Sequence, residues 1–219
     1  DRLELRRHVD VPRHARDDDY NEDGEEAQDD EESEEDEPTE VTGWTKLEES
    51  PDFLCNGMKL RSYQLDGLNW MRLSYYLGRN IILGDEMGLG KTAQSVSMLQ
   101  SLRSIEGVQG PFMIVAPLST LPHWERELSQ WTDMYWVNFH GTADARRVVQ
   151  QYEWLVDEKA PRGQEKYRFH VLLANYETVV QEPDALIAVK WQYLIVDEGH
   201  RLKNRNSRCL EVMNLLRCK

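Results

Sequence analysis

The sequence is poor in cysteine and has no long apolar run. Its three cysteines, Cys55, Cys209 and Cys218, are too few and too widely spaced for a disulfide framework or a zinc site. Reduced thiols in a cytosolic or nuclear compartment are therefore expected. No stretch approaches the roughly 20 apolar residues that span a bilayer, and the chain shows no signal-peptide pattern. We expect no contact with a membrane.

Basic residues are absent from residues 17–40, which hold 16 acidic residues and Tyr20 as their only aromatic side chain. Such a segment cannot bury enough apolar surface to offset the entropy lost on ordering. We expect residues 1–40 to be a disordered linker that contains this acidic run. The alternative is that the run binds basic histone tails, or covers a DNA-binding groove until it is displaced.

The net charge of −14 comes from this tail. Of the 40 acidic and 26 basic residues, 19 and 5 lie in residues 1–40, which leaves 21 of each in residues 41–219. A neutral remainder is compatible with nucleic-acid binding, whereas the overall charge alone would argue against it. The chain starts at Asp1 without an initiator Met and stops at Lys219 after a helix-like run, so we expect an internal piece of a longer protein.

After an expected anchoring segment over residues 41–60, apolar runs alternate with stretches of helical spacing. Runs typical of strands cover residues 80–83, 112–116, 136–140, 169–174 and 193–197. Apolar residues recur every three or four positions over residues 63–77, 93–102, 121–131, 143–155 and 209–216. This alternation predicts an α/β fold, a parallel sheet with helices on both faces. We expect it to occupy residues 61–219 and to be incomplete at its end.

A glycine-rich turn follows the first strand-like run and ends in Gly90, Lys91 and Thr92. Gly88 and Gly90 permit a tight turn whose N–H groups, at the start of the next helix, stabilise anions. Lys91 would bind the β and γ phosphates of a nucleotide, and the Thr92 hydroxyl would bind Mg²⁺. The strict phosphate-binding pattern has glycine at the position of Asp85.

Two adjacent acids, Asp197 and Glu198, follow the apolar run that starts at Tyr193. In an α/β sheet, ligands bind at the carboxyl edge of the strands. Asp197 would hold Mg²⁺, usually through water, and Glu198 would activate the attacking water. The alternative is a solvated strand end that caps a helix, and the Gly-Lys-Thr turn in the same chain disfavours it.

Four segments occur in a fixed order: LRSYQLDGLNW at 60–70, GDEMGLGKT at 84–92, VAPLSTLPHW at 115–124 and DEGHRLKN at 197–204. Together they resemble the Swi/Snf-type ATPases of the superfamily-two helicases. Shorter matches at residues 110–112, 131–134, 150–153 and 202–206, and the acidic stretch before Trp44, are most similar to the chromodomain-helicase-DNA-binding remodellers. The resemblance covers residues 44–219.

The resemblance implies the first, RecA-like lobe of a nuclear motor that uses ATP and Mg²⁺ and acts on double-stranded DNA and nucleosomes. It implies that Lys91, Asp197 and Glu198 are catalytic, and that Thr92 and Asp197 hold the metal. Gln64 would recognise the adenine edge, because an amide both donates and accepts hydrogen bonds. The other nucleotide-binding residues would be Asp85, Glu86, Met87, Gly88, Leu89, Gly90, Lys91 and Thr92.

The resemblance also implies DNA contacts and a link between lobes. The DNA contacts would be Pro117, Leu118, Ser119, Thr120 and, less specifically, Tyr176 and Glu177. Ser119 and Thr120 would equally be favoured as the N-cap of a helix. His200 would connect the nucleotide site to a partner lobe. The family usually has Ala where this chain has Gly199, a change that removes no catalytic group.

The family places an arginine finger on a second lobe, beyond Lys219. Without that arginine we expect weak ATP binding and hydrolysis slower by about 10³-fold or more. Two alternatives stay open: a strand-separating helicase or DNA-repair translocase of the same superfamily, and a non-catalytic module that binds histones through the acidic run. The presence of Lys91, Thr92, Asp197 and Glu198 together argues against the second.

Overall fold

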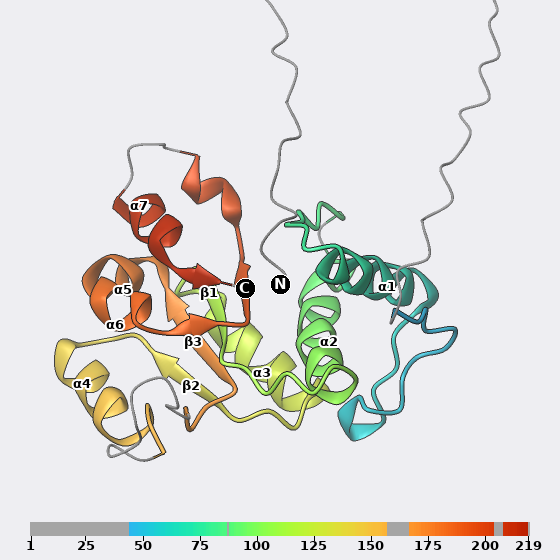
Figure 1. Ribbon diagram of the computed structural model, residues 1–219, viewed down its shortest axis with the longest axis horizontal. Coiled ribbons are helices and arrows are strands. Elements are labelled where there is room, and N and C mark those ends of the chain that lie inside the picture. Colours follow the sequence, from blue (N-terminus) through green and yellow to red (C-terminus); the bar gives the residue numbers. More distant parts are fainter. Residues whose placement is uncertain (1–43, 87, 157–166, 204–207, 219) are drawn as a thin grey trace, which may run out of the picture. The chain divides into compact units, whose positions relative to one another are not determined.

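The computed structural model describes residues 44–86, 88–156, 167–203 and 208–218 (Figure 1). The expected acidic linker over residues 1–40 and the predicted nucleotide-binding residue Met87 lie outside these ranges. Every element below belongs to the compact unit of residues 40–219. Within the described ranges, no helix has the length and apolar character needed to cross a membrane.

The central sheet has four parallel strands in the order β2-β3-β1-β5. Their bounds are β1 Phe112–Ala116, β2 Trp136–Phe139, β3 Val171–Asn175 and β5 Tyr193–Val196. Phe112 of β1 pairs with Val171 on one side and with Tyr193 on the other. All four strands lie where the apolar runs predict them, with ends displaced by two residues at most.

The five helices expected from apolar spacing are also present. They are α1 Ser62–Tyr76, α2 Lys91–Ser104, α3 Leu121–Trp131, α4 Ala143–Tyr152 and α7 Arg208–Leu215. The short elements were not predicted, because too few residues repeat to give a period. They are η1 Cys55–Gly57, α5 Tyr176–Gln181, α6 Pro183–Ile187, η2 Gly199–Leu202 and the paired strands β4 Lys190–Trp191 and β6 Arg217–Cys218.

Alternate residues of β1 pack into two different cores. Phe112 and Ile114 belong to the core that contains the buried residues of α1, α2 and α3. Met113 and Val115 belong to the second core, which includes residues of β4, α5, α6 and α7. The strand is apolar throughout because it is buried on both faces. This arrangement confirms the predicted parallel sheet with helices on both faces.

The predicted strand over residues 80–83 is wrong. This segment has no strand assignment, and it pairs with none of the described strands. Ile81 and Leu83 pack against the first core, whereas Ile82 between them is 90% exposed. The alternation is that of an extended chain with one buried side. A strand also needs hydrogen bonds to a partner backbone, and β5 makes none with this segment. The apolar content of residues 80–83 alone could not reveal this absence of pairing.

Two buried polar side chains of α1 hold the main chain of residues 45–47. The Asn69 side-chain amide accepts from the N–H of Leu47 and donates to its carbonyl, both over 2.9 Å. Arg72, only 2% exposed, donates from Nη1 to the carbonyl of Thr45 over 2.8 Å. Residues 45–47 are therefore held through their backbone, in addition to the packing of Leu47 against the first core.

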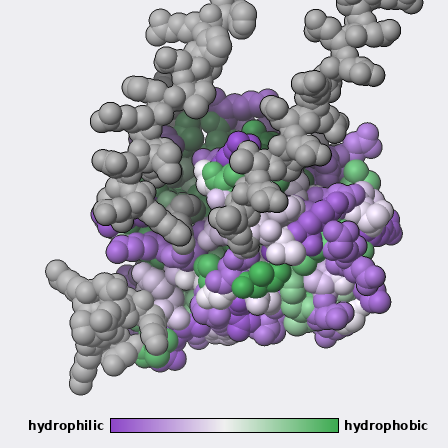
Figure 2. All heavy atoms as spheres, turned by 45° about the vertical axis from the view of Figure 1, so that its right-hand side comes forward, coloured by the Kyte–Doolittle hydropathy of each residue, from purple (hydrophilic) through white to green (hydrophobic). Residues whose placement is uncertain are grey.

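The surface of the described residues is mainly hydrophilic on the face shown in Figure 2, with apolar side chains in small patches between hydrophilic ones. The exposed large apolar residues of α1 include Tyr63 and Trp70, which are 38% and 44% exposed. Scattered apolar side chains of this kind are normal on a soluble surface.

The Asn69 contacts predict a specific loss of stability. Replacing Asn69→Ala leaves the N–H and carbonyl of Leu47 without their partners, so we expect the free energy of unfolding to fall by about 1–3 kcal/mol. Asn80→Ala, at an exposed position, should change it by less than about 0.5 kcal/mol. Urea unfolding measures both, and equal effects of the two substitutions would contradict the contacts described.

Candidate functional site

Lys91 closes the glycine-rich turn on itself. Its ammonium group donates to the carbonyl of Asp85 over 2.6 Å and to that of Glu86 over 2.9 Å. Gly88 and Gly90 have φ angles of 86° and 78°, a region that favours glycine. The first N–H groups of α2 have no partners within the helix. The turn therefore places the cation of Lys91 beside a helix N-terminus that stabilises anions.

Gln64 connects this turn to the start of α1. Its Nε2 donates to the carbonyl of Leu89 over 3.2 Å, and its Oε1 accepts from the N–H of Arg61 over 2.9 Å. A Cβ on Gly90 would lie 2.4 Å from Gln64 Nε2. Gln64 thus lies against the turn, and its recognition of adenine stays a prediction.

Asp85, which replaces the glycine of the strict pattern, has partners of its own. Its carboxylate accepts from Nε2 of Gln94, over 3.3 Å, and Gln94 is fully buried on α2. A Cβ on Gly67 of α1 would lie 2.0 Å from Gln94 Oε1. Sequence reasoning missed Gln94. Its position one turn after the start of α2 is the only signal, and many helix residues share it.

Asp197 and Glu198 form a second turn, directly after β5. The Asp197 carboxylate accepts from Trp124 Nε1 over 3.0 Å, and Thr120 Oγ1 lies 3.3 Å from the same oxygen. Glu198 has a left-handed backbone, with φ 54° and ψ 46°, which is uncommon for a residue with a side chain. Its Oε2 lies 3.1 Å from His200 Nδ1.

Tyr176 binds this turn from the end of β3. Its hydroxyl donates to the carbonyl of Asp197, at short range, and lies 3.3 Å from that of Glu198. Burial and then the negative charge of Asp197 raise the pKa of Tyr176 to about 12, so the hydroxyl stays a donor at neutral pH. Arg201 lies over the ring at 5.5 Å. Sequence reasoning assigned Tyr176 to DNA and missed its contacts with the main-chain carbonyls of Asp197 and Glu198.

The predicted site residues therefore form two groups. Gln64, Asp85, Glu86, Leu89, Gly90 and Lys91 are joined by hydrogen bonds or close approach before α2, and Thr120, Tyr176, Asp197, Glu198 and His200 are joined after the strands. Thr92 lies on the first turn of α2, half-buried. Across the described ranges, no hydrogen bond or ion pair joins the two groups. In Figure 1 both turns lie toward the top of the view.

The described part of the chain contains no group of three or more His, Cys, Asp or Glu side chains that could hold a metal ion. The metal predicted at Thr92 and Asp197 would therefore depend on ligands from a nucleotide and from water. Oxygen donors of this kind suit Mg²⁺, which keeps several waters and is usually bound through one or two carboxylates with substrate phosphates. The donor chemistry of Thr92 and Asp197 fits that ion.

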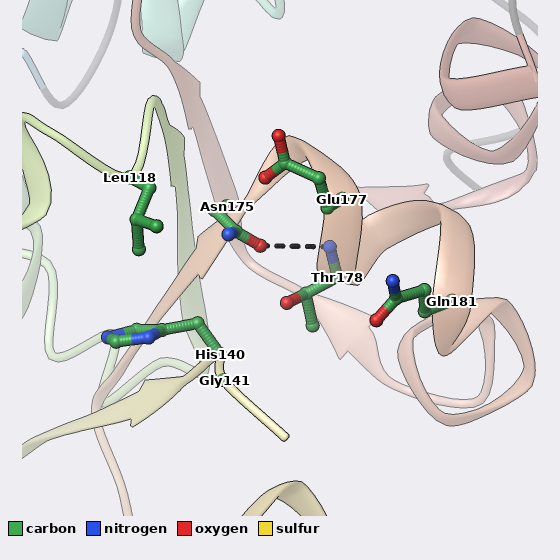
Figure 3. Close-up of a pocket in the computed structure, with 7 residues that line it drawn as sticks. All are labelled: Leu118, His140, Gly141, Asn175, Glu177, Thr178 and Gln181. Atoms are coloured by element: carbon green, nitrogen blue, oxygen red, sulfur yellow. Dashed lines mark hydrogen bonds between the residues drawn. The ribbon is translucent and has the colours of Figure 1, made fainter. Parts of the chain in front are cut away.

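A hollow of about 270 Å³ lies at the carboxyl ends of β1, β2 and β3 (Figure 3). Leu118 and His140 lie across from Thr178 and Gln181 in this view, and Asn175 accepts from the Thr178 N–H between them. Its lining residues are Leu118, His140, Gly141, Asn175, Glu177, Thr178 and Gln181. Two of the predicted DNA-contacting residues, Leu118 and Glu177, border it. No motif in the sequence indicated His140 or Gln181.

Comparisons with known proteins agree with these motifs. A family model described as the SNF2-related domain matches residues 63–219. Chromodomain-helicase-DNA-binding protein 8 of Danio rerio is 44% identical over 177 residues, which are 80% of this chain and 7% of that protein. Chromodomain-helicase-DNA-binding protein 9 of Homo sapiens is 44% identical over 174 residues, 79% of this chain and 6% of that protein. The chain thus spans less than a tenth of these relatives.

A solved structure has the same fold. The Sulfolobus solfataricus SWI2/SNF2 ATPase core in complex with dsDNA matches with a TM-score of 0.64 and 26% identity, over 80% of this chain and 32% of that one. The match confirms the predicted RecA-like fold class. The resemblance to Swi/Snf-type ATPases and to chromodomain-helicase-DNA-binding proteins is confirmed as well.

The close approach of Gln64 to Gly90 predicts an unequal response of two glycines. Gly78→Ala, at φ 64° with open space around it, should cost about 1–2 kcal/mol of unfolding free energy, from backbone strain alone. Gly90→Ala should cost about 1 kcal/mol more, because the new Cβ moves Gln64 off Leu89. In a Gln64→Ala background the excess should vanish. An excess that persists in that background would contradict the assigned contact.

Proposed function

The chain belongs to the SNF2-related domain family, and we propose that it is part of the first motor lobe of an ATP-driven, double-stranded-DNA translocase that slides or restructures nucleosomes in the nucleus. The observation that carries the proposal is the turn before α2, where the partners of the Lys91 ammonium group among the described residues are two carbonyl oxygens. An ammonium group in that position can exchange neutral acceptors for the charged oxygens of a phosphate, which bind it more strongly.

The nucleotide would bind across the turn and the start of α2. The backbone N–H groups at the helix N-terminus would bind phosphate oxygens, and Lys91 would move from Asp85 and Glu86 to the β and γ phosphates. Gln64, which already contacts the turn through Leu89, would bind the adenine edge with its amide. ATP would thus contact α1 and α2 together.

The acidic turn would provide the chemistry of hydrolysis. Glu198 would accept a proton from the attacking water, and its carboxylate is oriented by His200 over 3.1 Å. Thr92 and Asp197 would hold Mg²⁺, which when bound neutralises negative charge on the phosphate oxygens. The two turns share no hydrogen bond in the described residues, so the nucleotide and Mg²⁺ would connect them.

Support for the DNA substrate comes from the relatives. One solved relative is a SWI2/SNF2 core in complex with dsDNA, and the curated relatives are named for chromodomains, helicase and DNA binding. In this chain Leu118 and Ser119 are exposed between β1 and α3, where hydroxyl and N–H groups could bind backbone phosphates. Because the relatives are much longer, we propose that turnover needs a second lobe with its arginine finger.

Lys91→Ala tests the nucleotide site. In the full-length protein we expect DNA-stimulated ATP turnover to fall by about 10²-fold or more, since the cation that stabilises the phosphates is lost. Lys190→Ala, which removes an exposed lysine of β4, is the matched control and should leave turnover unchanged. Normal turnover of Lys91→Ala would refute the assignment.

Assays on the full-length protein distinguish translocation along duplex DNA from separation of its strands. The proposed function predicts ATP-dependent movement along duplex DNA without release of single strands. If the protein unwinds a duplex in a strand-displacement assay, the helicase alternative within the superfamily is correct instead.

The acidic run supports a second, separate candidate function. Its 16 acidic residues over residues 17–40 are suited to basic histone tails by charge alone. Deleting residues 17–40 from the full-length protein should weaken histone binding by about tenfold at low salt, with a smaller effect at high salt. ATP turnover on free DNA should persist. Unchanged histone binding at low salt would exclude this role for the acidic run.

A further inference from the structure

The Asp197 carboxylate contacts α3 and its N-cap, directly after the predicted DNA contacts at residues 117–119. Trp124 Nε1 donates to Asp197 Oδ2 over 3.0 Å, and the Thr120 hydroxyl lies 3.3 Å from the same oxygen. Both donors belong to α3 or to its N-cap. The N–H of Asp197 donates to Val115 of β1 over 2.8 Å. Asp197 is thus held through its main chain by β1 and through its side chain by α3, the two elements that residues 117–120 connect.

Thr120 has one proton and two acceptors. Its hydroxyl lies 3.0 Å from the carbonyl of Pro117 and 3.3 Å from the carboxylate of Asp197. A hydroxyl donates only one hydrogen bond at a time, so these two acceptors compete. A DNA phosphate at residues 117–120 would be a third acceptor, and a charged one. A phosphate bound at residues 117–120 would therefore change the hydrogen bonds that the Asp197 carboxylate accepts.

Trp124 takes part in this network without access to a ligand. Its side chain is 3% exposed, so DNA bound at the surface cannot contact the indole. Leu118 and Ser119, in contrast, are exposed in the turn before α3. Whatever Trp124 contributes must act through Asp197 or through packing. That separation allows coupling and DNA contact to be measured independently.

Tyr176 provides a second connection, which reaches the main chain of Asp197 and not its carboxylate. It follows β3, was assigned to DNA by resemblance, and donates its hydroxyl to the carbonyl of Asp197. The acids and the two predicted DNA contacts therefore share hydrogen bonds across three neighbouring strand ends. Glu198 keeps its left-handed backbone within this network, where the Tyr176 hydroxyl lies 3.3 Å from its carbonyl.

We propose that Thr120 and Trp124 are positioning residues that couple DNA contact at residues 117–120 to the Asp197 carboxylate. The proposal rests on the proposed function, because it assumes that DNA binds there and that Asp197 serves ATP hydrolysis. When a DNA phosphate accepts the hydrogen bond of the Thr120 hydroxyl, Asp197 Oδ2 keeps the hydrogen bond from Trp124. One lone pair of Oδ2 is then free of Thr120. By linkage, the factor by which DNA changes the affinity for the nucleotide equals the factor by which the nucleotide changes the affinity for DNA.

Trp124→Phe in the full-length protein is the direct test, with Trp131→Phe as the matched control. Trp131 is also buried on α3, but its indole N–H donates to Glu127. For Trp124→Phe we expect the stimulation of ATP turnover at saturating duplex DNA to fall by about fivefold or more. The affinity for duplex DNA in the absence of nucleotide should not change, because the indole does not contact DNA. Trp131→Phe should retain normal stimulation.

Equilibrium binding gives a readout that does not depend on turnover. The affinity for duplex DNA is measured with and without a non-hydrolysable ATP analogue and Mg²⁺. The wild-type protein should show a difference between the two affinities, Trp131→Phe should keep it, and Trp124→Phe should lose most of it. A Trp124→Phe protein that behaves like Trp131→Phe in both assays would overturn the proposal.

Thr120 supplies a second pair of variants in case Trp124→Phe fails to fold. Thr120→Ser keeps the hydroxyl and should retain the stimulation at saturating DNA, whereas Thr120→Val, of similar shape, should lose it. Equal stimulation in the two variants would overturn the proposal. If the wild-type protein shows no DNA-stimulated turnover at all, the proposed function itself is wrong, and this result differs from each of the others.

Discussion

The shared register of three parallel strands determines where the polar residues of this chain meet. Phe112, Val171 and Tyr193 are aligned across β1, β3 and β5, so the residues after each strand emerge at one edge of the sheet. Thr120, Tyr176 and Asp197 are separated by 21 or more positions in the chain, yet they are joined by hydrogen bonds there. The packing of β1 against helices on both faces maintains this register, because each strand is held by two cores.

The turn before α2 is stabilised differently, from helices and not from the sheet. Gln64 on α1 and Gln94 on α2 bind the backbone or side chain of the turn, and Lys91 satisfies two of its carbonyls. In the proposed function, Lys91 would leave these two carbonyls to bind a phosphate. The segment that precedes the turn, residues 80–83, has no strand assignment and pairs with none of the described strands.

Local patterns were enough to predict most elements and both turns. Four strands and five helices follow from apolar spacing, and Gly88, Gly90, Lys91 and the Asp197-Glu198 pair follow from residue type and order. The contacts between distant residues could not be predicted in this way. The bond from Trp124 to Asp197 joins residues with a sequence separation of 73, and the role of Gln94 depends on the approach of α1 at Gly67. The prediction of a strand at residues 80–83 fails for the same reason, since strand pairing depends on a neighbouring backbone and not on composition.

We propose that contact with DNA changes the hydrogen bonding of the half-buried Asp197 carboxylate through α3, the helix that follows β1. The indole N–H signals of the protein labelled with ¹⁵N at tryptophan report this directly, with Trp124 assigned by its substitution to Phe. On addition of duplex DNA the Trp124 signal should shift while that of Trp131, on the same helix but bonded to Glu127, should not. Saturating DNA binding that leaves the Trp124 signal in place would contradict the account.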